Sequence, residues 1–450
     1  MAHEKFHYKT LEDVQEKAQE LHLSLPFAAD TKILAAPLKI GSITLHNRLG
    51  IAPMEGADSL PDGSPSDYTL RRYVKEAAGG SAVIWFEAIS IVEEGRSSRT
   101  QLLLTKDNLE QYKVFTNTVK EAGIKANGFA PYLIMQANHS GRYSNPDNQP
   151  APMIAYRHPY LEQYRAADDS CIVTDDYLKG LEEKFGEAAR LAKEAGFDAV
   201  DIKSCHGYLL AELSSAYHRP GMYGGSYENR TRLLKNGIRA AKVYEDSEFQ
   251  VTARLGIYDG YAYPYGFGVS EDSGLTPDAT EPIRLVRELK EEGLSMINLT
   301  MGNPYATTHV TRPYDAGKYI PEEHPLVGIG RMIHGIESVK RAVPEMIVWG
   351  SAPTYLRQFS DLFTAGAVEE GYCDGMLFGR MAFADPDFAN EIVRNGRIDP
   401  KRVCLTCGKC GDLIRAHKPT GCIVRDPETF LPFYKEFQEI KKTQPANFRG

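Results

Sequence analysis

The sequence predicts an α/β fold, a TIM (β/α)8 barrel with an N-terminal helical extension and a C-terminal cysteine-rich segment. From residue 38 onward, short apolar runs alternate with amphipathic stretches, a pattern typical of parallel strands joined by helices. Eight such apolar runs favour closure into a barrel. An open, doubly wound sheet is disfavoured because no Gly-x-Gly-x-x-Gly loop follows the first run.

The predicted strands are the short runs rich in aliphatic residues. They are Leu49–Pro53, Ala82–Phe86, Ala126–Leu133, Ala199–Ile202, Gln250–Leu255, Met296–Leu299, Met346–Trp349 and Gly375–Phe378. Helical periodicity between them indicates helices at Leu181–Ala195, Arg230–Val243, Pro282–Glu292 and Pro353–Ala365. Before the first of these helices, Thr174, Asp175 and Asp176 are candidate N-caps, and Gly196 is the candidate C-terminal glycine.

Three segments are expected along the chain. Residues 1–37 form an extension in which Leu11–Leu23 has helical periodicity, so an extra helix is expected outside the barrel. Residues 38–396 form the barrel. Residues 397–450 form the cysteine-rich segment and tail.

Two long insertions, Ser140–Val173 and Gly256–Thr280, interrupt the strand–helix pattern. Both follow predicted strands, so both are expected on the face where barrel enzymes build their active sites. Their Tyr, Arg and Pro content suits a lid or a substrate pocket, and ordinary surface loops remain the alternative.

The composition is that of a soluble globular protein, with 450 residues, 42% hydrophobic and 25% charged. The net charge of -8 argues against a general nucleic-acid-binding surface. No run approaches the roughly 20 apolar residues of a membrane span, and the N-terminus lacks the apolar region of a secretory signal. We therefore expect a cytoplasmic protein without nucleic-acid or membrane partners; a homo-oligomeric state stays open.

The segment after the fourth predicted strand carries a set of polar side chains, Lys203, His206 and Tyr208. In a barrel, the end of a strand directs such groups into the catalytic mouth. His and Lys can donate hydrogen bonds to a developing oxyanion, and Tyr can supply a proton. These three residues are therefore the candidate catalytic set, with a structural histidine as the alternative for His206.

Several fragments in order resemble the Old Yellow Enzyme family of FMN-dependent ene reductases. LHNRLGIAPM at 45–54 is similar to the family's first strand, and Gln136, His139, Gly141 and Arg142 match its Gln-x-x-His-x-Gly-Arg pattern. KSCHGY at 203–208 resembles its His-x-x-His/Asn-Gly-Tyr, and YGGSYENR at 223–230 matches its next signature. The resemblance covers most of the chain.

The resemblance implies a site for FMN. The implied FMN-binding residues are Ala52, Pro53, Met54, Glu55, Ala88, Gln136, Arg254, Gly350, Ser351, Gly379 and Arg380. Gln136 would bond the pyrimidine edge of the flavin, and Arg254 would stabilise its anionic reduced form. The last four residues would hold the phosphate at the barrel's phosphate site.

The resemblance also implies a two-step reaction. NAD(P)H would reduce the flavin, which would then give hydride to an activated C=C bond of a small unsaturated substrate. His206 and Lys203 would hold the substrate oxygen, and Tyr208 would protonate the carbon. The alternatives are a flavin dehydrogenase that oxidises an amine or alcohol and passes electrons to a partner, and a non-catalytic flavin-binding subunit.

Two residues depart from the family's pattern. Lys203 stands where the family usually has a histidine, which either favours a more anionic substrate or reflects a pair with Glu55 or Glu87. Glu55 stands where the family usually has Thr, Cys or Gly. A carboxylate there would disfavour electron-rich reduced states of the flavin.

Four cysteines crowd into one stretch, Cys404, Cys407, Cys410 and Cys422, and this crowding indicates metal or cluster binding. The run resembles the family branch containing 2,4-dienoyl-CoA reductase and trimethylamine dehydrogenase, which implies a [4Fe–4S] cluster. Structural zinc and free thiols remain alternatives. Because the chain ends at Gly450, a cluster is expected to exchange electrons with a separate protein or to be structural. Covalent FMN attachment is not expected, since no cysteine lies in the first strands.

Overall fold

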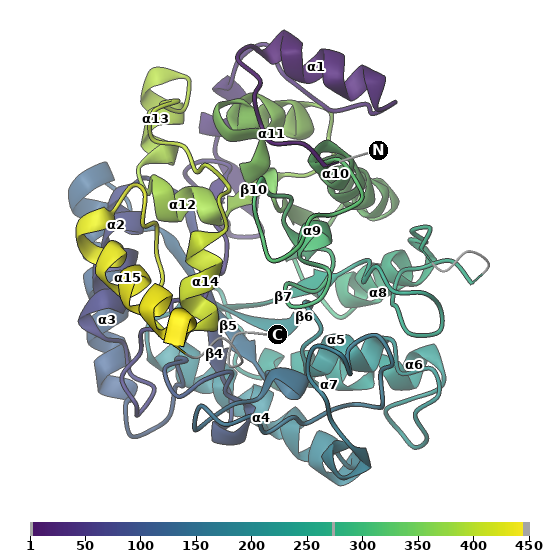
Figure 1. Cartoon of the computed structure of the whole chain (residues 1–450). Helices are drawn as coiled ribbons and strands as arrows, with labels where there is room; N and C mark the ends of the chain where they lie inside the picture. Colours follow the sequence, from purple (N-terminus) through teal and green to yellow (C-terminus); the bar gives the residue numbers. More distant parts are fainter. Residues whose placement is uncertain (1–2, 272–274, 444–450) are drawn as a thin grey trace.

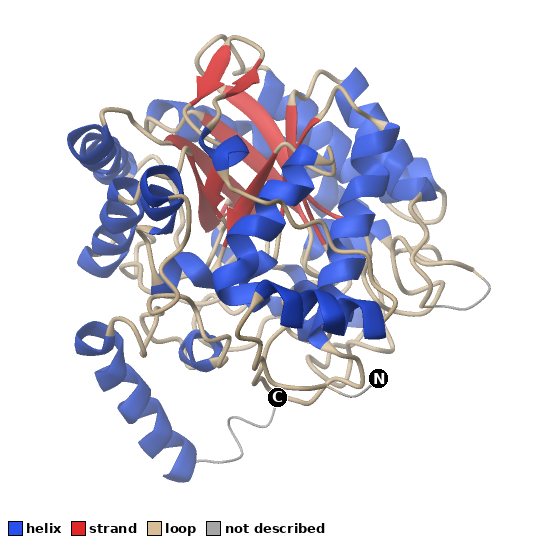
Figure 2. Ribbon diagram, turned by 90° about the horizontal axis from the view of Figure 1, so that it is seen from above, coloured by secondary structure: helices blue, strands red, loops and turns tan. Residues whose placement is uncertain are grey.

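Eight parallel strands close into a barrel in the computed structural model, which describes residues 3–271 and 275–443. The strand order is β10-β3-β4-β5-β6-β7-β8-β9, so the first and last barrel strands pair with each other. Helices surround the strands (Figure 1 and Figure 2). The predicted (β/α)8 barrel is confirmed.

The barrel strands are short and buried. They are β3 Leu49–Ile51, β4 Val83–Ser90, β5 Tyr132–Asn138, β6 Ala199–Ser204, β7 Gln250–Gly256, β8 Met296–Thr300, β9 Ile347–Gly350 and β10 Gly375–Phe378. The longer helices around them are α2 Asp67–Ala78, α3 Leu109–Asn127, α4 Asp175–Glu194, α7 Arg232–Lys242, α8 Thr280–Glu291, α10 Pro325–Ala342, α11 Ser360–Glu369 and α13 Phe388–Asn395. Short helical pieces fill the loops: α5 Leu209–Ser214, α6 Tyr227–Arg230, α9 Thr308–Thr311 and α12 Arg380–Ala384.

The third strand prediction, Ala126–Leu133, is wrong in its first half. Helix α3 continues to Asn127 and ends at Gly128, whose φ of 81° is the left-handed conformation that glycine adopts readily after a helix. The strand β5 begins only at Tyr132, so Gln136 lies inside the strand. The other seven strand predictions overlap the observed strands.

Helix α4 is capped at both ends as the sequence predicts. The hydroxyl of Thr174 accepts a hydrogen bond from the backbone N–H of Tyr177 at 3.1 Å. At the other end, Gly196 is left-handed with a φ of 87°, a conformation that favours glycine after a helix. The N-cap and the C-terminal glycine are therefore confirmed.

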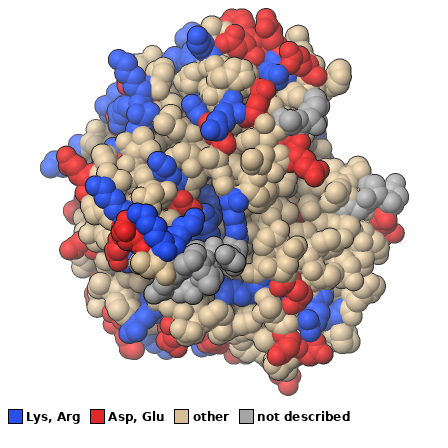
Figure 3. All heavy atoms as spheres, viewed as in Figure 1, with Lys and Arg blue, Asp and Glu red and all other residues tan. Residues whose placement is uncertain are grey.

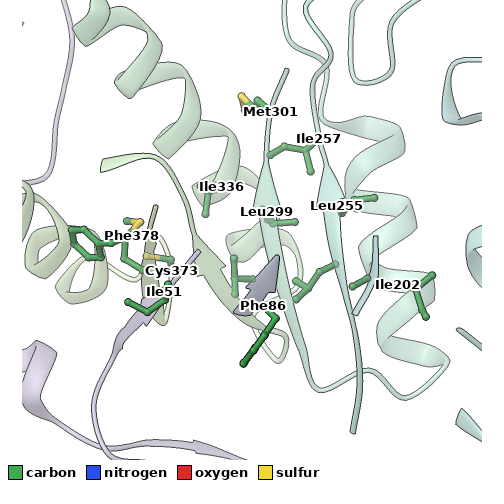
Figure 4. Close-up of a cluster of buried hydrophobic side chains, with 14 of the residues drawn as sticks. Ile51, Phe86, Ile202, Leu255, Ile257, Leu299, Met301, Ile336, Cys373 and Phe378 are labelled. Atoms are coloured by element: carbon green, nitrogen blue, oxygen red, sulfur yellow. The ribbon is translucent and has the colours of Figure 1, made fainter. Parts of the chain in front are cut away.

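Strand alternation divides the apolar side chains into two layers. Outward-facing residues such as Phe86, Ile202 and Leu299 belong to the large cluster between the strands and the helices (Figure 4). Inward-facing Trp85 and Trp349 belong to a second cluster. This cluster also contains Ala199 and Met296, the first residues of β6 and β8, so it lies toward the N-terminal ends of the strands. The same alternation directs Asp201 and Lys203, the neighbours of Ile202 in β6, into the barrel interior.

The two extensions pack on different parts of the barrel. In the N-terminal extension, α1 Leu11–Glu20 starts with a capping box and buries Val14 and Ala18. The hairpin of β1 Leu38–Ile40 and β2 Ile43–Leu45 packs against this second cluster, the one that contains Trp85 and Trp349. In the C-terminal segment, α14 Lys409–Arg415 and α15 Pro427–Thr443 follow α13. The domain boundaries stay predictions. Among the described residues, no helix is long and apolar enough to cross a membrane.

Candidate functional site

Asp201 is the centre of a hydrogen-bond network inside the barrel. Its Oδ2 accepts hydrogen bonds from Gln136 Nε2 at 2.6 Å and from Trp85 Nε1 at 2.7 Å, and its Oδ1 accepts one from the backbone N–H of Arg254 at 2.5 Å. Because the Gln136 amide nitrogen faces the carboxylate, its oxygen is left to accept a bond from a ligand. Sequence reasoning missed Asp201, although it lies in a predicted strand.

Gln136, Asp201, Lys203 and Arg254 face one another on β5, β6 and β7, and we call them the strand-end site. Register pairs Gln136 with Asp201 and Lys203 with Arg254. The Arg254 side chain is buried, and its Nε has no hydrogen-bond partner among the described residues. A buried guanidinium in this condition fits a ligand that brings acceptor atoms or negative charge, as FMN does.

Lys203 lies beside the phenol of Tyr208, with Nζ 3.8 Å from the ring centroid. Burial lowers the pKa of Lys203 to about 8, and the nearby Cys205 and Glu55 oppose this shift. Glu55 accepts a hydrogen bond from the Ser97 hydroxyl, and burial raises its pKa. Lys203 and Glu55 favour each other's charged form, but no ion pair joins them among the described residues, so the predicted pairing stays a prediction.

The other pairing, between Lys203 and Glu87, is wrong. Glu87 instead binds the guanidinium of Arg72, and its Oε2 accepts a hydrogen bond from the backbone N–H of Gly56 at 2.8 Å. Arg72 also donates to the carbonyl of Met54 at 2.7 Å. The Arg72–Glu87 pair thus holds the residues on both sides of Glu55, a role that sequence reasoning missed.

The predicted residues Ala52, Pro53 and Met54 directly follow β3, and Ala88 pairs with Gln136 in register across β4 and β5. A bulge between Trp85 and Ala88 shifts the register of β4. Bulges next to active sites commonly redirect side chains. The assignment of these residues to the flavin stays a prediction.

A sharp turn after β6 carries the candidate catalytic histidine and tyrosine. His206 and Gly207 are both left-handed, with φ of 67° and 70°. A Cβ on Gly207 would lie 2.1 Å from Nδ2 of Asn303, so only glycine fits there.

His206 Nε2 lies 3.3 Å from the Thr300 hydroxyl, and burial lowers the pKa of His206, which keeps its imidazole neutral. Burial raises the pKa of Tyr208.

Two further tyrosines lie at this turn and were missed. The hydroxyls of Tyr208 and Tyr305 are 2.8 Å apart, and the ring of Tyr305 stacks on Tyr143. Tyr305 follows the end of β8, so the strand-end rule that favours Tyr208 also applies to it. The loop after β8 is not one of the two long insertions, which is why its tyrosine stood out less in the sequence.

The residues implied for the phosphate follow the last two barrel strands: Gly350, Ser351, Gly379 and Arg380. The Ser351 hydroxyl lies 3.0 Å from Nδ2 of Asn298, and Arg380 donates to the carbonyl of Pro313 at 2.7 Å. Arg312, also missed, lies near Arg380, and burial lowers its pKa to about 10. Two guanidinium groups close together suit an anion.

The four clustered cysteines line one cavity together with Arg380 and Phe383, and we call it the cysteine cavity. All four are free thiols. Backbone N–H groups of Thr406 and Arg425 donate to the sulfurs of Cys404 and Cys422 at 3.3 and 3.4 Å, an arrangement typical of cluster ligands. Lys and Arg side chains gather on the face formed by α14 and α15 (Figure 3).

Burial raises the pKa of Cys404 to about 12, so this thiol stays protonated near neutral pH without a bound metal. Burial also raises the pKa of Cys410, and Arg312 and Arg380 oppose that shift. In the described ranges, no group of three His, Cys, Asp or Glu residues is arranged to hold a single metal ion.

Arg230, in the YGGSYENR motif at 223–230, and Arg142 form ion pairs that join separate segments of the chain. Arg230 pairs with Glu281 on α8 at 2.6 Å, and Arg142 forms a fully buried pair with Glu212 on α5 at 2.5 Å. The two insertions contact each other, since His158 Nε2 lies 2.9 Å from the carbonyl of Tyr265. Their role as a lid or pocket stays a prediction.

A parallel (β/α)8 barrel with polar side chains gathered at the strand ends has the architecture of a barrel enzyme. The chain belongs to the NADH:flavin oxidoreductase / NADH oxidase family, whose sequence profile matches residues 33–332. It is an FMN-dependent oxidoreductase, and the resemblance to the Old Yellow Enzyme family is confirmed.

Curated relatives are similar over much of the chain. An NADPH dehydrogenase of Bacillus velezensis is 30% identical over 273 residues, 60% of this chain and 73% of the relative. A cinnamate reductase of Clostridium sporogenes is 26% identical over 430 residues, 91% of this chain but only 60% of the relative.

Solved structures show the same fold. A 2-naphthoyl-CoA reductase complex superposes with a TM-score of 0.72 at 19% identity, covering 90% of this chain and 58% of that one. An old yellow enzyme homologue from Zymomonas mobilis superposes with a TM-score of 0.59 at 21% identity, covering 81% and 94%. At these identities the likeness concerns the fold alone.

Proposed function

We propose that this protein is an ene reductase, which adds hydride to an activated C=C bond of an enone, enoate or dienoyl compound. The observation that carries the proposal is the position of Tyr208, a buried phenol beside Lys203 at the mouth of the strand-end site. When bound, FMN supplies the hydride. Gln136, Arg254 and the phosphate residues around Arg380 are the groups proposed to hold it.

The chain's own side chains orient the substrate and deliver a proton. Neutral His206 and the Lys203 ammonium donate hydrogen bonds to the substrate oxygen, which stabilises the negative charge that develops there. Tyr208 protonates the carbon next to the carbonyl. This division matches the pKa directions, since the raised pKa of Tyr208 keeps it protonated until it meets a strong base.

We propose that the cysteine cavity holds a [4Fe–4S] cluster, with zinc as the alternative. Four thiols around one cavity, with backbone N–H groups aimed at two sulfurs, support a cluster. Arg380 lines this cavity and belongs to the proposed phosphate site, so the two cofactors would be neighbours. That proximity also favours a second candidate, oxidation of an amine or alcohol with electrons leaving through the cluster to a partner protein.

The test is spectroscopic. Anaerobically purified protein should show an oxidised flavin spectrum, and iron and acid-labile sulfide in equal amounts. NADPH or NADH should bleach the flavin, and cyclohex-2-enone should restore it. Bleaching by an amine or alcohol instead would favour the second candidate, and zinc without iron would contradict the cluster.

Tyr208→Phe tests the proton donor. It should slow reoxidation of the flavin by the enone about 100-fold or more, because general acids contribute at least this much. Reduction of the flavin by NAD(P)H should be unaffected. Equal losses in both half-reactions would contradict the role of Tyr208.

A further inference from the structure

We propose that Tyr305 is the relay that returns a proton to Tyr208 in the same step in which Tyr208 protonates the substrate. The inference rests on the proposed function, in which Tyr208 gives a proton to the substrate. Tyr305 acts through Tyr208 and is therefore a positioning residue. The geometry that carries the proposal is the 2.8 Å contact between the two hydroxyls.

A relay is needed because Tyr208 is buried, with only 4% of its surface exposed. Each reduction removes one proton from its phenol, and burial, which raises the pKa of Tyr208, makes the resulting phenolate unfavourable. Tyr305 is half-buried, less enclosed than Tyr208, and hydrogen-bonded to it, so the relay takes the proton from solvent through Tyr305.

The orientation of Tyr305 is set before any substrate binds. Its ring stacks on Tyr143 with centroids 3.7 Å apart and an interplanar angle of 15°. Oδ1 of Asn303 accepts a hydrogen bond from the backbone N–H of Tyr305 at 2.9 Å, and Nδ2 of Asn303 donates to the Tyr143 hydroxyl at 2.9 Å. One amide thus fixes both rings.

Asn303 also fixes the distance between Tyr208 and Tyr305. Its side chain packs against Gly207, the residue before Tyr208, so the turn after β6 and the loop after β8 are in direct contact. Lys203 adds a positive charge 3.8 Å from the Tyr208 ring centroid. That charge stabilises the negative charge that develops on the Tyr208 oxygen while the proton is replaced.

The proton transfers balance. As the O–H bond of Tyr208 breaks, its proton goes to the substrate carbon. The Tyr208 oxygen takes the proton of the Tyr305 hydroxyl, and the Tyr305 oxygen takes one from water, leaving hydroxide to the buffer. The relay moves protons only, and the hydride comes from the reduced flavin of the proposed reaction.

The experiment uses the holoenzyme, reduced anaerobically and mixed with cyclohex-2-enone while flavin absorbance is followed. Tyr305→Phe keeps the ring and removes the hydroxyl. Reoxidation should slow about 10- to 100-fold, the effect of losing one hydrogen bond to a charged oxygen. Flavin reduction should keep its wild-type rate, which also shows that the variant is folded.

Tyr112→Phe is the matched control. Tyr112 lies on helix α3, and its buried hydroxyl donates to the carbonyl of Gly63 at 2.8 Å. The variant loses a comparable hydrogen bond without touching the two tyrosines of the relay, so reoxidation should stay within about twofold of wild type.

The second readout is the dependence of reoxidation on the fraction of D2O. Two protons moving together make this dependence curved in the wild type, and Tyr305→Phe should make it linear. A structural defect lowers the rate without changing the shape of the curve. A linear dependence in the wild type overturns the relay whatever the variant does.

The outcomes separate the relay from the proposed function. Wild-type reoxidation in Tyr305→Phe overturns the relay alone. A larger loss in Tyr305→Phe than in Tyr208→Phe also overturns it, because Tyr305 would then be the donor itself. If the enone fails to reoxidise the wild-type protein, or Tyr208→Phe reacts normally, the proposed function fails first.

Discussion

The strand-end site and the cysteine cavity are held in place in different ways. In the strand-end site, Asp201 accepts hydrogen bonds from groups on three neighbouring strands. In the cysteine cavity, the sulfurs lie on loops and on the short helix α14, and backbone N–H groups reach two of them. Side chains on strands keep their geometry without a ligand, whereas thiols on loops would depend on the proposed metal centre to join them.

The largest effect is expected from Cys404→Ser. Loss of one of four thiolates should remove nearly all bound iron and sulfide, because metal binding and local folding are coupled. The FMN content should stay close to that of the wild type, since Gln136 and Arg254, two of the groups proposed to hold the flavin, lie on barrel strands away from the cysteines. Iron, sulfide and flavin are measured on the same sample. Cys171→Ser, on an insertion, is the control, and parallel loss of FMN would contradict the independence of the two regions.

Asp201→Ala should destabilise the barrel by about 3 kcal/mol or more. It leaves three buried donors without their acceptor, and each such group costs about 1 to 3 kcal/mol. Urea unfolding followed by flavin fluorescence gives the free energy. The exposed Glu248→Ala is the control and should change stability by less than about 0.5 kcal/mol. A similar small change for Asp201 would mean that the network does not organise the site.

The rate of substrate reduction should fall as the pH rises through about 8, because Lys203 loses its proton there. Burial is the main cause of its lowered pKa; Cys205, Glu55 and Asp201 favour the charged form, and Arg254 opposes it. In the proposed reaction the ammonium, present below that pH, donates to the substrate oxygen, and the neutral amine above it is a weaker donor. Reoxidation rates of wild type and Lys203→Met between pH 6 and 10 test this. A pH-independent wild-type rate would contradict the role.

The lowered pKa of Lys203 also affects stability. Between about pH 8 and the ordinary pKa of 10.5, the unfolded chain binds more protons at this residue than the folded one. Wild type should therefore gain stability relative to Lys203→Met as the pH rises through this window, by roughly 1 kcal/mol per pH unit. Urea midpoints at pH 7 and 10 give the difference.

The smallest effect is expected from Arg71→Ala. Its guanidinium binds both oxygens of Asp426 at 2.7 and 3.1 Å and joins α2 to the C-terminal segment, but the pair is partly exposed. Such pairs contribute up to about 1 kcal/mol. Thermal unfolding should show a small change, with iron content unaltered. Loss of iron would mean that this contact, and not the thiols, orders the cysteine cavity.

Sequence reasoning found candidate functional residues that lie close to one another in the sequence. Lys203, His206 and Tyr208 lie close together after one strand, so the strand-end rule sufficed. It missed groups whose partners are distant. Asp201 bonds Trp85 across 116 positions, and Tyr208 bonds Tyr305 across 97. Pairings of this kind arise only when the barrel closes.

By itself, the sequence determined the barrel, its family and the four cysteines, because strand–helix periodicity and short motifs are local properties of the chain. Only the tertiary structure decided that Glu87 binds Arg72 rather than Lys203, and that Arg380 borders the cysteine cavity. Both depend on which strand ends and loops meet in space. Closure of the barrel brings those distant segments together.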